Sequence, residues 1–272
     1  MIKLLKAQIF RAVKKPWLIL IFLITFTITV WIAVSPLRDT YSYQGFMNRY
    51  GSMSPQTVSR MVLDEARPDM SISDIYDEFM IRQKDFLFPT AYVATATGLA
   101  FMGCIIAAFF LGRELTKRRT RAVLIPGQSR GLVFTLLAVR YYLAAFILIV
   151  ASLGMVRTQW SIDLSMFPRD YVVSTQLRFL LYCFSVFSGM MLVTVLVRNP
   201  VGSALASLAF VGLAVLAGYL ASTVFPTASL LSYKWWEPTV GAEYITPHVI
   251  TSAIAIVVFT AASYIIYRNR EI

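Results

Sequence analysis

The chain has 272 residues, of which 58% are hydrophobic and only 14% are charged. Soluble domains carry about 25% charged residues, so this composition excludes an ordinary soluble domain and indicates an integral membrane protein. The net charge of +11 would suit a nucleic-acid-binding protein. However, the basic residues are confined to short segments beside apolar runs, so we expect a lipid bilayer as partner and no nucleic acid.

The first residues predict a helix on the membrane surface followed by a first span. Residues 1–15 carry five basic residues and no acidic one, and their apolar residues recur at helical spacing. This pattern is typical of an amphipathic interfacial helix. After Pro16, residues 17–34 form an apolar run. A cleaved signal peptide is the alternative, but its apolar core is typically only about 7–15 residues long, so we favour a retained span.

Residues 36–89, the outer segment, are the only long polar stretch, with six basic and eight acidic residues. Ser54 followed by Pro55 predicts one helix start, and Ser71 with Asp74 predicts a second, capped one. An apolar stripe at helical spacing follows this second cap: Ile72, Ile75, Tyr76, Phe79 and Met80. The stripe must be buried against another helix, the outer membrane surface or a second protomer. We expect a small folded cap rather than a ligand-binding domain.

Five further apolar runs complete an expected all-α fold of six transmembrane helices. They cover residues 90–111, 131–156, 179–197, 201–225 and 248–267. All eleven prolines lie outside these spans, as expected for a residue that disrupts helix interiors. Cys104 and Cys183 fall inside apolar runs and are expected to be packing residues rather than a disulfide. Gly202 and Ala206, four residues apart, would permit close helix packing in the fifth span.

The distribution of charge predicts the orientation. The segments that carry most of the positive charge are residues 1–15 and the loop over residues 112–131, which has six basic residues and one acidic residue. Such segments mark the cytoplasmic side, so we expect both termini to be cytoplasmic and the protein to lie in the plasma membrane. The aromatic-rich residues 226–247 then form a belt at the outer interface.

Residues 112–131, hereafter the basic loop, are the candidate functional segment. Residues 113–125 contain no Gly or Pro and predict a short helix, which Pro126 and Gly127 would end. The simplest interpretation is that the loop only fixes the orientation of the chain.

The basic loop also carries a family pattern. It begins Gly-x-Glu at Gly112 and Glu114, continues with basic residues and threonine, and ends Leu-x-Pro-x-x-Ser-Arg from Leu124 to Arg130. This pattern, with the six-span plan, resembles the permease subunits of type-2 ABC exporters. In that family the loop of the permease forms a coupling helix, which contacts a separate ATPase subunit and transmits its movement. The resemblance assigns ATPase coupling to Glu114, Leu115, Arg118, Arg119, Arg121, Leu124, Pro126 and Arg130.

The resemblance further implies partners and a mechanism. Two permeases, identical or homologous, would work with two ATPase subunits, and alternating access would move the substrate between the permeases. Residues 226–247 would dip back into the membrane. ATP and magnesium would be bound by the partner ATPase, with no cofactor in this chain. Permeases of this compact kind resemble exporters of peptides or antimicrobial compounds, and also exporters of small drugs.

The residues themselves indicate no catalytic or metal site. The chain has one histidine, no phosphate-binding Gly-x-x-x-x-Gly-Lys-Ser/Thr motif and no acidic residue inside an expected span. We therefore expect no enzymatic activity in this chain, and the missing acids disfavour a secondary carrier. A non-transporting scaffold or sensor, with the outer segment as its receptor part, remains the alternative from another functional class.

Arg140 is the one ionisable residue well inside an expected span. Tyr141 and Tyr142 follow it and suggest that the membrane interface lies nearby. The simpler interpretation is that Arg140 extends its charge to the cytoplasmic face. The alternative is that it lines the transport path or pairs with Glu114.

Overall fold

The computed structural model describes residues 41–116, 129–160, 169–224 and 245–269, together with Ile24, Thr27 and Trp31. These residues form helices, and no strand occurs among them. The expected all-α fold class is therefore confirmed for this part of the chain. The interfacial helix over 1–15, nearly all of the first span and most of the belt over 226–247 lie outside the described residues.

Three described helices are long and apolar enough to cross a membrane. They lie within α7 (Arg130–Trp160), α8 (Arg169–Val197) and α10 (Ile245–Asn269). Two shorter apolar helical stretches are Gly98–Gly112 and Pro200–Leu213, the second within α9 (Pro200–Val224). The protein is thus an all-helical membrane protein, whereas six spans remain a prediction.

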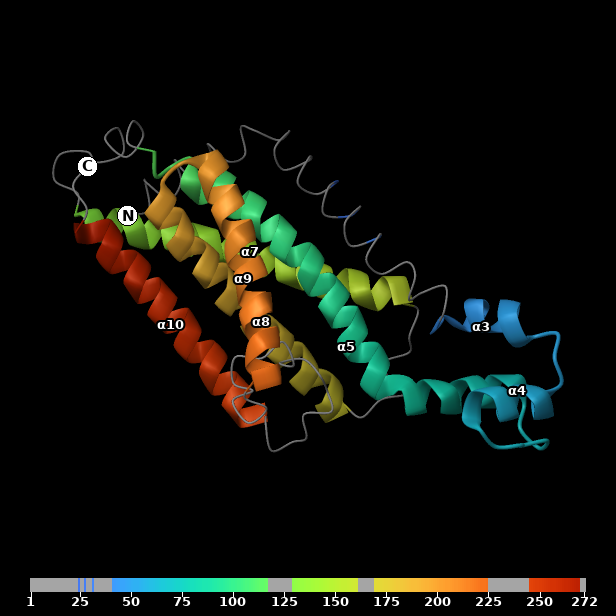
Figure 1. The fold of residues 1–272 in the computed structure, drawn as a ribbon. Coiled ribbons are helices and arrows are strands. Elements are labelled where there is room, and N and C mark those ends of the chain that lie inside the picture. The colour runs from blue at the N-terminus through green and yellow to red at the C-terminus, as the bar shows by residue number, and fades with distance from the viewer. Residues whose placement is uncertain are drawn as a thin grey trace.

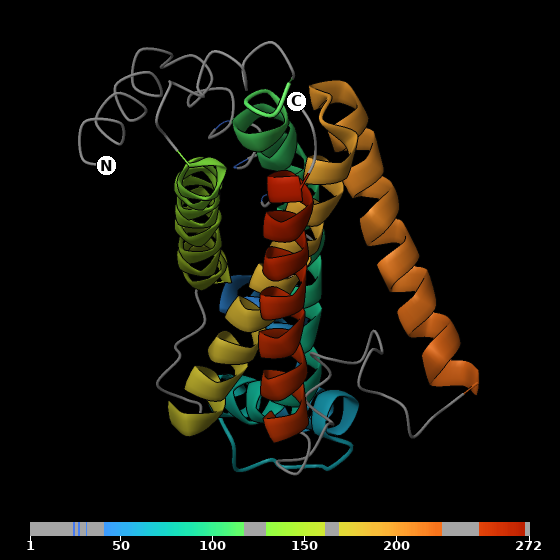
Figure 2. The same ribbon diagram turned by 90° about the vertical axis from the view of Figure 1, so that its left-hand side faces the viewer.

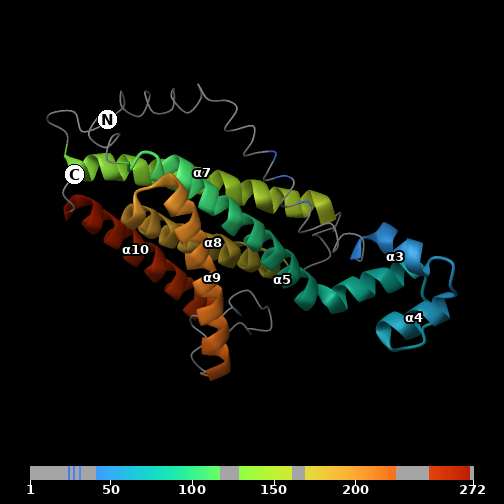
Figure 3. The ribbon, with the colours of Figure 1, turned by 45° about the horizontal axis from the view of Figure 1, so that its top comes forward.

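The outer segment and the second apolar run share one helix, α5 (Ile72–Ile106), which continues as the π-helix η1 (Ala107–Gly112). The sequence predicts the boundary between the outer segment and the second span at Pro89, and α5 runs through this position as one helix. Proline lacks an amide hydrogen and cannot bond to the carbonyl one turn earlier, which bends a helix without necessarily ending it. Figures 1 and 3 show that α5 changes direction along its length.

Helix α8 lies at the centre of the helical bundle, in contact with α5, η1, α7, α9 and α10. The views in Figures 1 and 2 show α7 and α10 beside it, whereas α9 runs away from α10 along its length. Close packing depends on small residues at two crossings. A β-carbon on Gly103 would lie 2.8 Å from the sulfur of Met190, and one on Gly189 would lie 2.2 Å from the ring of Phe210.

Large side chains and both cysteines fill the bundle. Cys104 and Cys183 are buried and free, which confirms them as packing residues. Tyr141 is only 1% exposed, and its hydroxyl donates to the carbonyl of Phe187 in α8 at 3.0 Å. Its ring therefore fills the core and its hydroxyl joins two helices, a role that the sequence did not indicate.

The neighbouring tyrosine makes a second polar link inside the bundle. The hydroxyl of Tyr142 lies 2.8 Å from that of Ser188 in α8, and it also bonds to the hydroxyl of Thr260 in α10. Side-chain hydrogen bonds of this kind join transmembrane helices, each typically by about 0.6 kcal/mol. Tyr142 therefore connects three helices that carry the apolar stretches.

The helical cap consists of α3 (Tyr43–Tyr50), α4 (Pro55–Leu63) and the beginning of α5. It lies at the far end of the molecule from the C-terminal ends of α8 and α10 (Figures 1 and 3). Serine side chains cap all three helices, and Ser71 forms the expected reciprocal pair with Asp74. The predicted stripe on α5 is buried against the other two helices. The core of the helical cap consists of Phe46, Val58, Leu63, Ile75, Tyr76 and Met80.

Candidate functional site

The basic loop begins where η1 ends. The amide of Arg113 donates to the carbonyl of Ala108 at 3.0 Å, a bond that spans five residues and defines the wide π turn. Such turns are rare and are frequent at functional sites. No local signal in the sequence distinguishes this turn from an ordinary α-helix.

The described beginning of the loop is a turn rather than the expected helix. Residues 113–115 form a turn in which Glu114 is half-buried and Leu115 is only 1% exposed. Leu115 thus packs into the bundle. The remaining predicted coupling residues up to the end of the loop lie outside the described residues: Arg118, Arg119, Arg121, Leu124 and Pro126.

Gly112 brings the start of the loop against the beginning of α9. A β-carbon at this position would lie 3.1 Å from the hydroxyl oxygen of Ser203 and 3.3 Å from the α-carbon of Pro200. The second contact is with backbone, which cannot turn aside as a side chain can. Gly112 therefore allows η1 and α9 to approach closely. A movement of the loop would displace α9 directly.

Arg140 has an aromatic partner that the sequence did not suggest. Its guanidinium carbon lies 5.2 Å from the centre of the Phe110 ring in η1, and the arginine is half-buried. Glu114 also exerts a favourable electrostatic attraction on Arg140. A cation over an aromatic face contributes about 0.5–1 kcal/mol at exposed sites and more when water is excluded. Arg140 thus links α7 to the helix that leads into the basic loop.

A second group of polar residues lies where α7 begins, α8 passes into α9 and α10 ends. We call Arg130, Arg198 and Tyr267 the arginine–tyrosine cluster. The positive charges of both arginines act on the Tyr267 hydroxyl. Arg130 is one of the predicted coupling residues, whereas the sequence indicates no functional role for Arg198 or Tyr267. Their positions lie far apart in sequence, so no spacing rule could have joined them.

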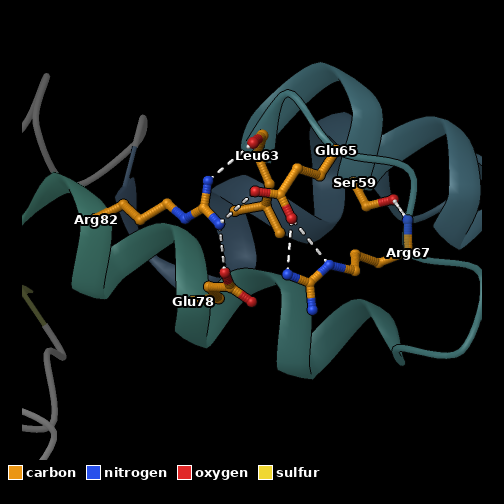
Figure 4. A network of polar contacts seen from close by, with 6 residues as sticks. All are labelled: Ser59, Leu63, Glu65, Arg67, Glu78 and Arg82. Carbon is orange, nitrogen blue, oxygen red and sulfur yellow. Dashed lines mark hydrogen bonds and ion pairs between the residues drawn. The ribbon is translucent and has the colours of Figure 1, made fainter.

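The helical cap contains a network of ion pairs that fixes it to α5 (Figure 4). The guanidinium group of Arg82 binds the carboxylates of Glu78 at 2.6 Å and Glu65 at 3.3 Å, and it donates to the carbonyl of Leu63 at 2.9 Å. Arg67 binds Glu65 at 2.7 Å. Hydrogen bonds from Arg67 and then Arg82 lower the pKa of Glu65 below its ordinary value.

The backbone around this network is held by a buried hydroxyl. The oxygen of Ser59, which is fully buried, accepts a hydrogen bond from the amide of Arg67 at 2.9 Å (Figure 4). Together these contacts join the end of α4 and the connection after it to the first turns of α5. The arrangement fits a structural role, since every charged member is paired and none of them is fully buried.

No protein-family model matches this chain, and comparisons with curated proteins and with solved structures found no match. The class of this protein is defined by its fold alone, which is that of a membrane protein with a helical bundle and a helical cap. The basic loop, Arg140 and the arginine–tyrosine cluster are its candidate functional features.

Proposed function

We propose that the chain is the membrane-spanning permease subunit of an ATP-driven, type-2 ABC exporter that moves a peptide or antimicrobial compound by alternating access. The observation that carries this proposal is the basic loop between two apolar helices, α5 with η1 and then α7. The loop pattern supports the family, and the burial of Leu115 supports a mechanical role, because the start of the loop is anchored in the bundle.

The contacts around the loop suggest how force would pass through it. Gly112 lies against Pro200 of α9, and Phe110 lies under the guanidinium group of Arg140 in α7. A displacement of the loop by a partner would therefore move η1 against two other helices. The displaced element contains a π turn, a kind of turn that is frequent at functional sites.

The partners follow from the same proposal. Two copies of an ATPase subunit would bind ATP and magnesium and close on each other, and a second permease, identical or homologous, would complete the path. The cationic side chains of the basic loop would steer it toward an acidic rim on the ATPase, which favours orientation and association rate more than affinity.

A sensor or scaffold is the second candidate function, and one observation favours it. The helical cap is continuous with the bundle through α5, so an event at the cap has a direct mechanical connection to the basic loop. A sensor would require this connection but no ATPase.

Co-purification of the full chain with an ABC ATPase subunit from its own cells tests the proposal. Glu114→Ala and Leu124→Asp should reduce complex formation or uncouple substrate-stimulated ATPase activity from transport in the reconstituted complex. Asp170→Ala is the matched control, since this exposed acid lies at the start of α8. If both loop variants retain wild-type complex formation and transport, the loop is only an orientation signal and the permease proposal loses its main support.

Orientation is tested separately by thiol labelling in a background without Cys104 and Cys183. Single cysteines at Ser52 and Ser229 should react with an impermeant reagent from outside intact cells, whereas one at Thr120 should not. Labelling at Thr120 would place the basic loop on the outer side, where no ATPase could reach it.

A further inference from the structure

Two serines in the first half of α9 have buried hydroxyl groups that make no hydrogen bond within the part of the chain that the structure describes. Ser203 and Ser207 are both 0% exposed, and both hydroxyl oxygens are buried without a partner there. The two residues are four positions apart and therefore lie on the same face of the helix. A buried hydroxyl without a bond costs free energy, because it has lost its bonds to water. Both costs fall on one face of α9.

Other fully buried serines of the bundle avoid this cost by bonding within their own helix. The hydroxyl of Ser152 in α7 donates to the carbonyl four residues earlier at 2.7 Å, and that of Ser263 in α10 does the same at 2.6 Å. The hydroxyl of Ser203 faces η1 instead, since its oxygen lies 3.1 Å from the position that a β-carbon on Gly112 would take. The unbonded hydroxyls therefore belong to the contact between α9 and η1.

The contact that Gly112 of η1 makes with the face of α9 that carries Ser203 and Ser207, hereafter the serine contact, has few large side chains to hold it. Three of the four buried residues of η1 are alanine or glycine. On the opposite face of α9, Val201 and Leu205 are 68% and 64% exposed. Lipid is as apolar as these side chains, so α9 can shift outward in a membrane without a hydrophobic penalty on that face.

Separation of η1 and α9 would allow both hydroxyls to bond to water. The serine contact lies where η1 ends and the basic loop begins, so a displacement of the loop acts on it directly. We propose that the serine contact opens and admits water between η1 and α9, and that the unbonded hydroxyls of Ser203 and Ser207 favour the open state. This opening takes place within one chain and needs no ATPase, so it applies equally to an exporter and to a sensor.

Cysteine labelling of the full chain in membrane vesicles tests this proposal. Ser203→Cys and Ser207→Cys are made separately in a background without Cys104 and Cys183, and a charged methanethiosulfonate reagent is added to both sides of the membrane. The reactive species is the thiolate, which forms far more readily in water than in an apolar core. Both cysteines should therefore react. Ser152→Cys is the matched control and should stay unlabelled, because that serine is equally buried but its hydroxyl is bonded.

Two further substitutions should move the labelling rate of Ser207→Cys in opposite directions. Ser203→Ala removes an unbonded hydroxyl from the closed contact, so the closed state gains stability and labelling should slow by on the order of tenfold. Gly112→Ala adds a methyl group 3.1 Å from the Ser203 hydroxyl oxygen and 3.3 Å from the α-carbon of Pro200, so it should hold the helices apart and speed labelling. Gly212→Ala is the control, because its methyl group meets no atom within 4 Å, and it should leave the rate unchanged.

The competing explanation is that each serine turns its hydroxyl to a carbonyl of its own helix, as Ser152 does. The serine contact then stays closed, and Ser203→Cys and Ser207→Cys react no faster than Ser152→Cys, a result that overturns the proposal. Labelling that Ser203→Ala leaves unchanged, or that Gly112→Ala slows, also overturns it. Ser203→Cys combined with Ser207→Ala repeats the measurement from the other position, so the test does not depend on the folding of a single variant.

Discussion

The crossing of α8 and α9 gives the sharpest stability prediction, through the substitution Gly189→Ala. A β-carbon on Gly189 would lie 2.2 Å from Cζ and 2.5 Å from Cε1 of Phe210. Carbon atoms pack without repulsion at about 3.5–4.0 Å, so the ring must retreat by more than about 1 Å. Either Phe210 leaves its rotamer or the two helices separate.

Two opposing terms decide the sign. Alanine is favoured over glycine inside a helix by about 0.8–1.0 kcal/mol, whereas inserting a methyl group into packed space costs about 1–3 kcal/mol. Gly212→Ala in α9 is the matched control, because its β-carbon would meet no atom within 4 Å. We therefore expect Gly212→Ala to stabilise the protein, and Gly189→Ala to be less stable than this control by about 1–3 kcal/mol.

Unfolding by SDS in mixed micelles, followed by helical circular dichroism, measures both variants. Phe210→Leu in the Gly189→Ala background should recover most of the loss, since a smaller and more flexible side chain yields to the new methyl group. If Gly189→Ala is as stable as Gly212→Ala, the close contact between Gly189 and Phe210 is incorrect, and the arrangement of α8 and α9 must be revised.

Three further predictions concern polar contacts. Tyr141→Phe should cost about 0.5–1.5 kcal/mol in the same unfolding titration, because a buried hydrogen bond to α8 is lost; an unchanged midpoint would contradict that bond. Hydrogen bonds from Ser71 lower the pKa of Asp74, so capping stabilises α5 above the ordinary carboxyl pKa and is lost as the pH falls through the lower folded value. The protection of residues 72–80 against hydrogen exchange, taken relative to the intrinsic exchange rate at each pH, should fall in that acidic range, and Asp74→Asn should show lowered protection already at pH 7. Arg140→Lys should cost about 0.5–1 kcal/mol, but nothing in a Phe110→Leu background; an equal cost in both backgrounds would exclude the ring contact.

Local patterns in the sequence predicted the helical cap well. The capping pair Ser71 and Asp74 lies within one turn, and the apolar stripe after it follows directly from helical spacing. Both are consequences of helix geometry, which neighbouring residues determine. The first cap helix was missed although Ser42 precedes Tyr43, Phe46 and Tyr50 at the same kind of spacing. That signal was present but short.

Features that depend on distant contacts were not predictable. The sequence suggested Gly202 and Ala206 as the packing pair of α9, whereas Ser203 and Ser207, one position further on, are the fully buried residues. A repeat of small residues gives the spacing of a contact face but not its rotation. The core position of Tyr141 was not predictable for a related reason, because an aromatic residue near a charge is equally typical of a membrane interface and of a helix–helix contact.

A single continuous stretch of helix connects the helical cap to the basic loop. From Ile72 to the end of η1 at Gly112 the chain is helical throughout, a length of about 60 Å at 1.5 Å per residue. At one end Arg82 fixes this helix to the cap through Glu65 and Glu78. At the other end Gly112 holds it against α9. A sensor requires such a link, and an exporter that responds to its substrate can also use it. The distinction lies at the basic loop, where only an exporter needs an ATPase.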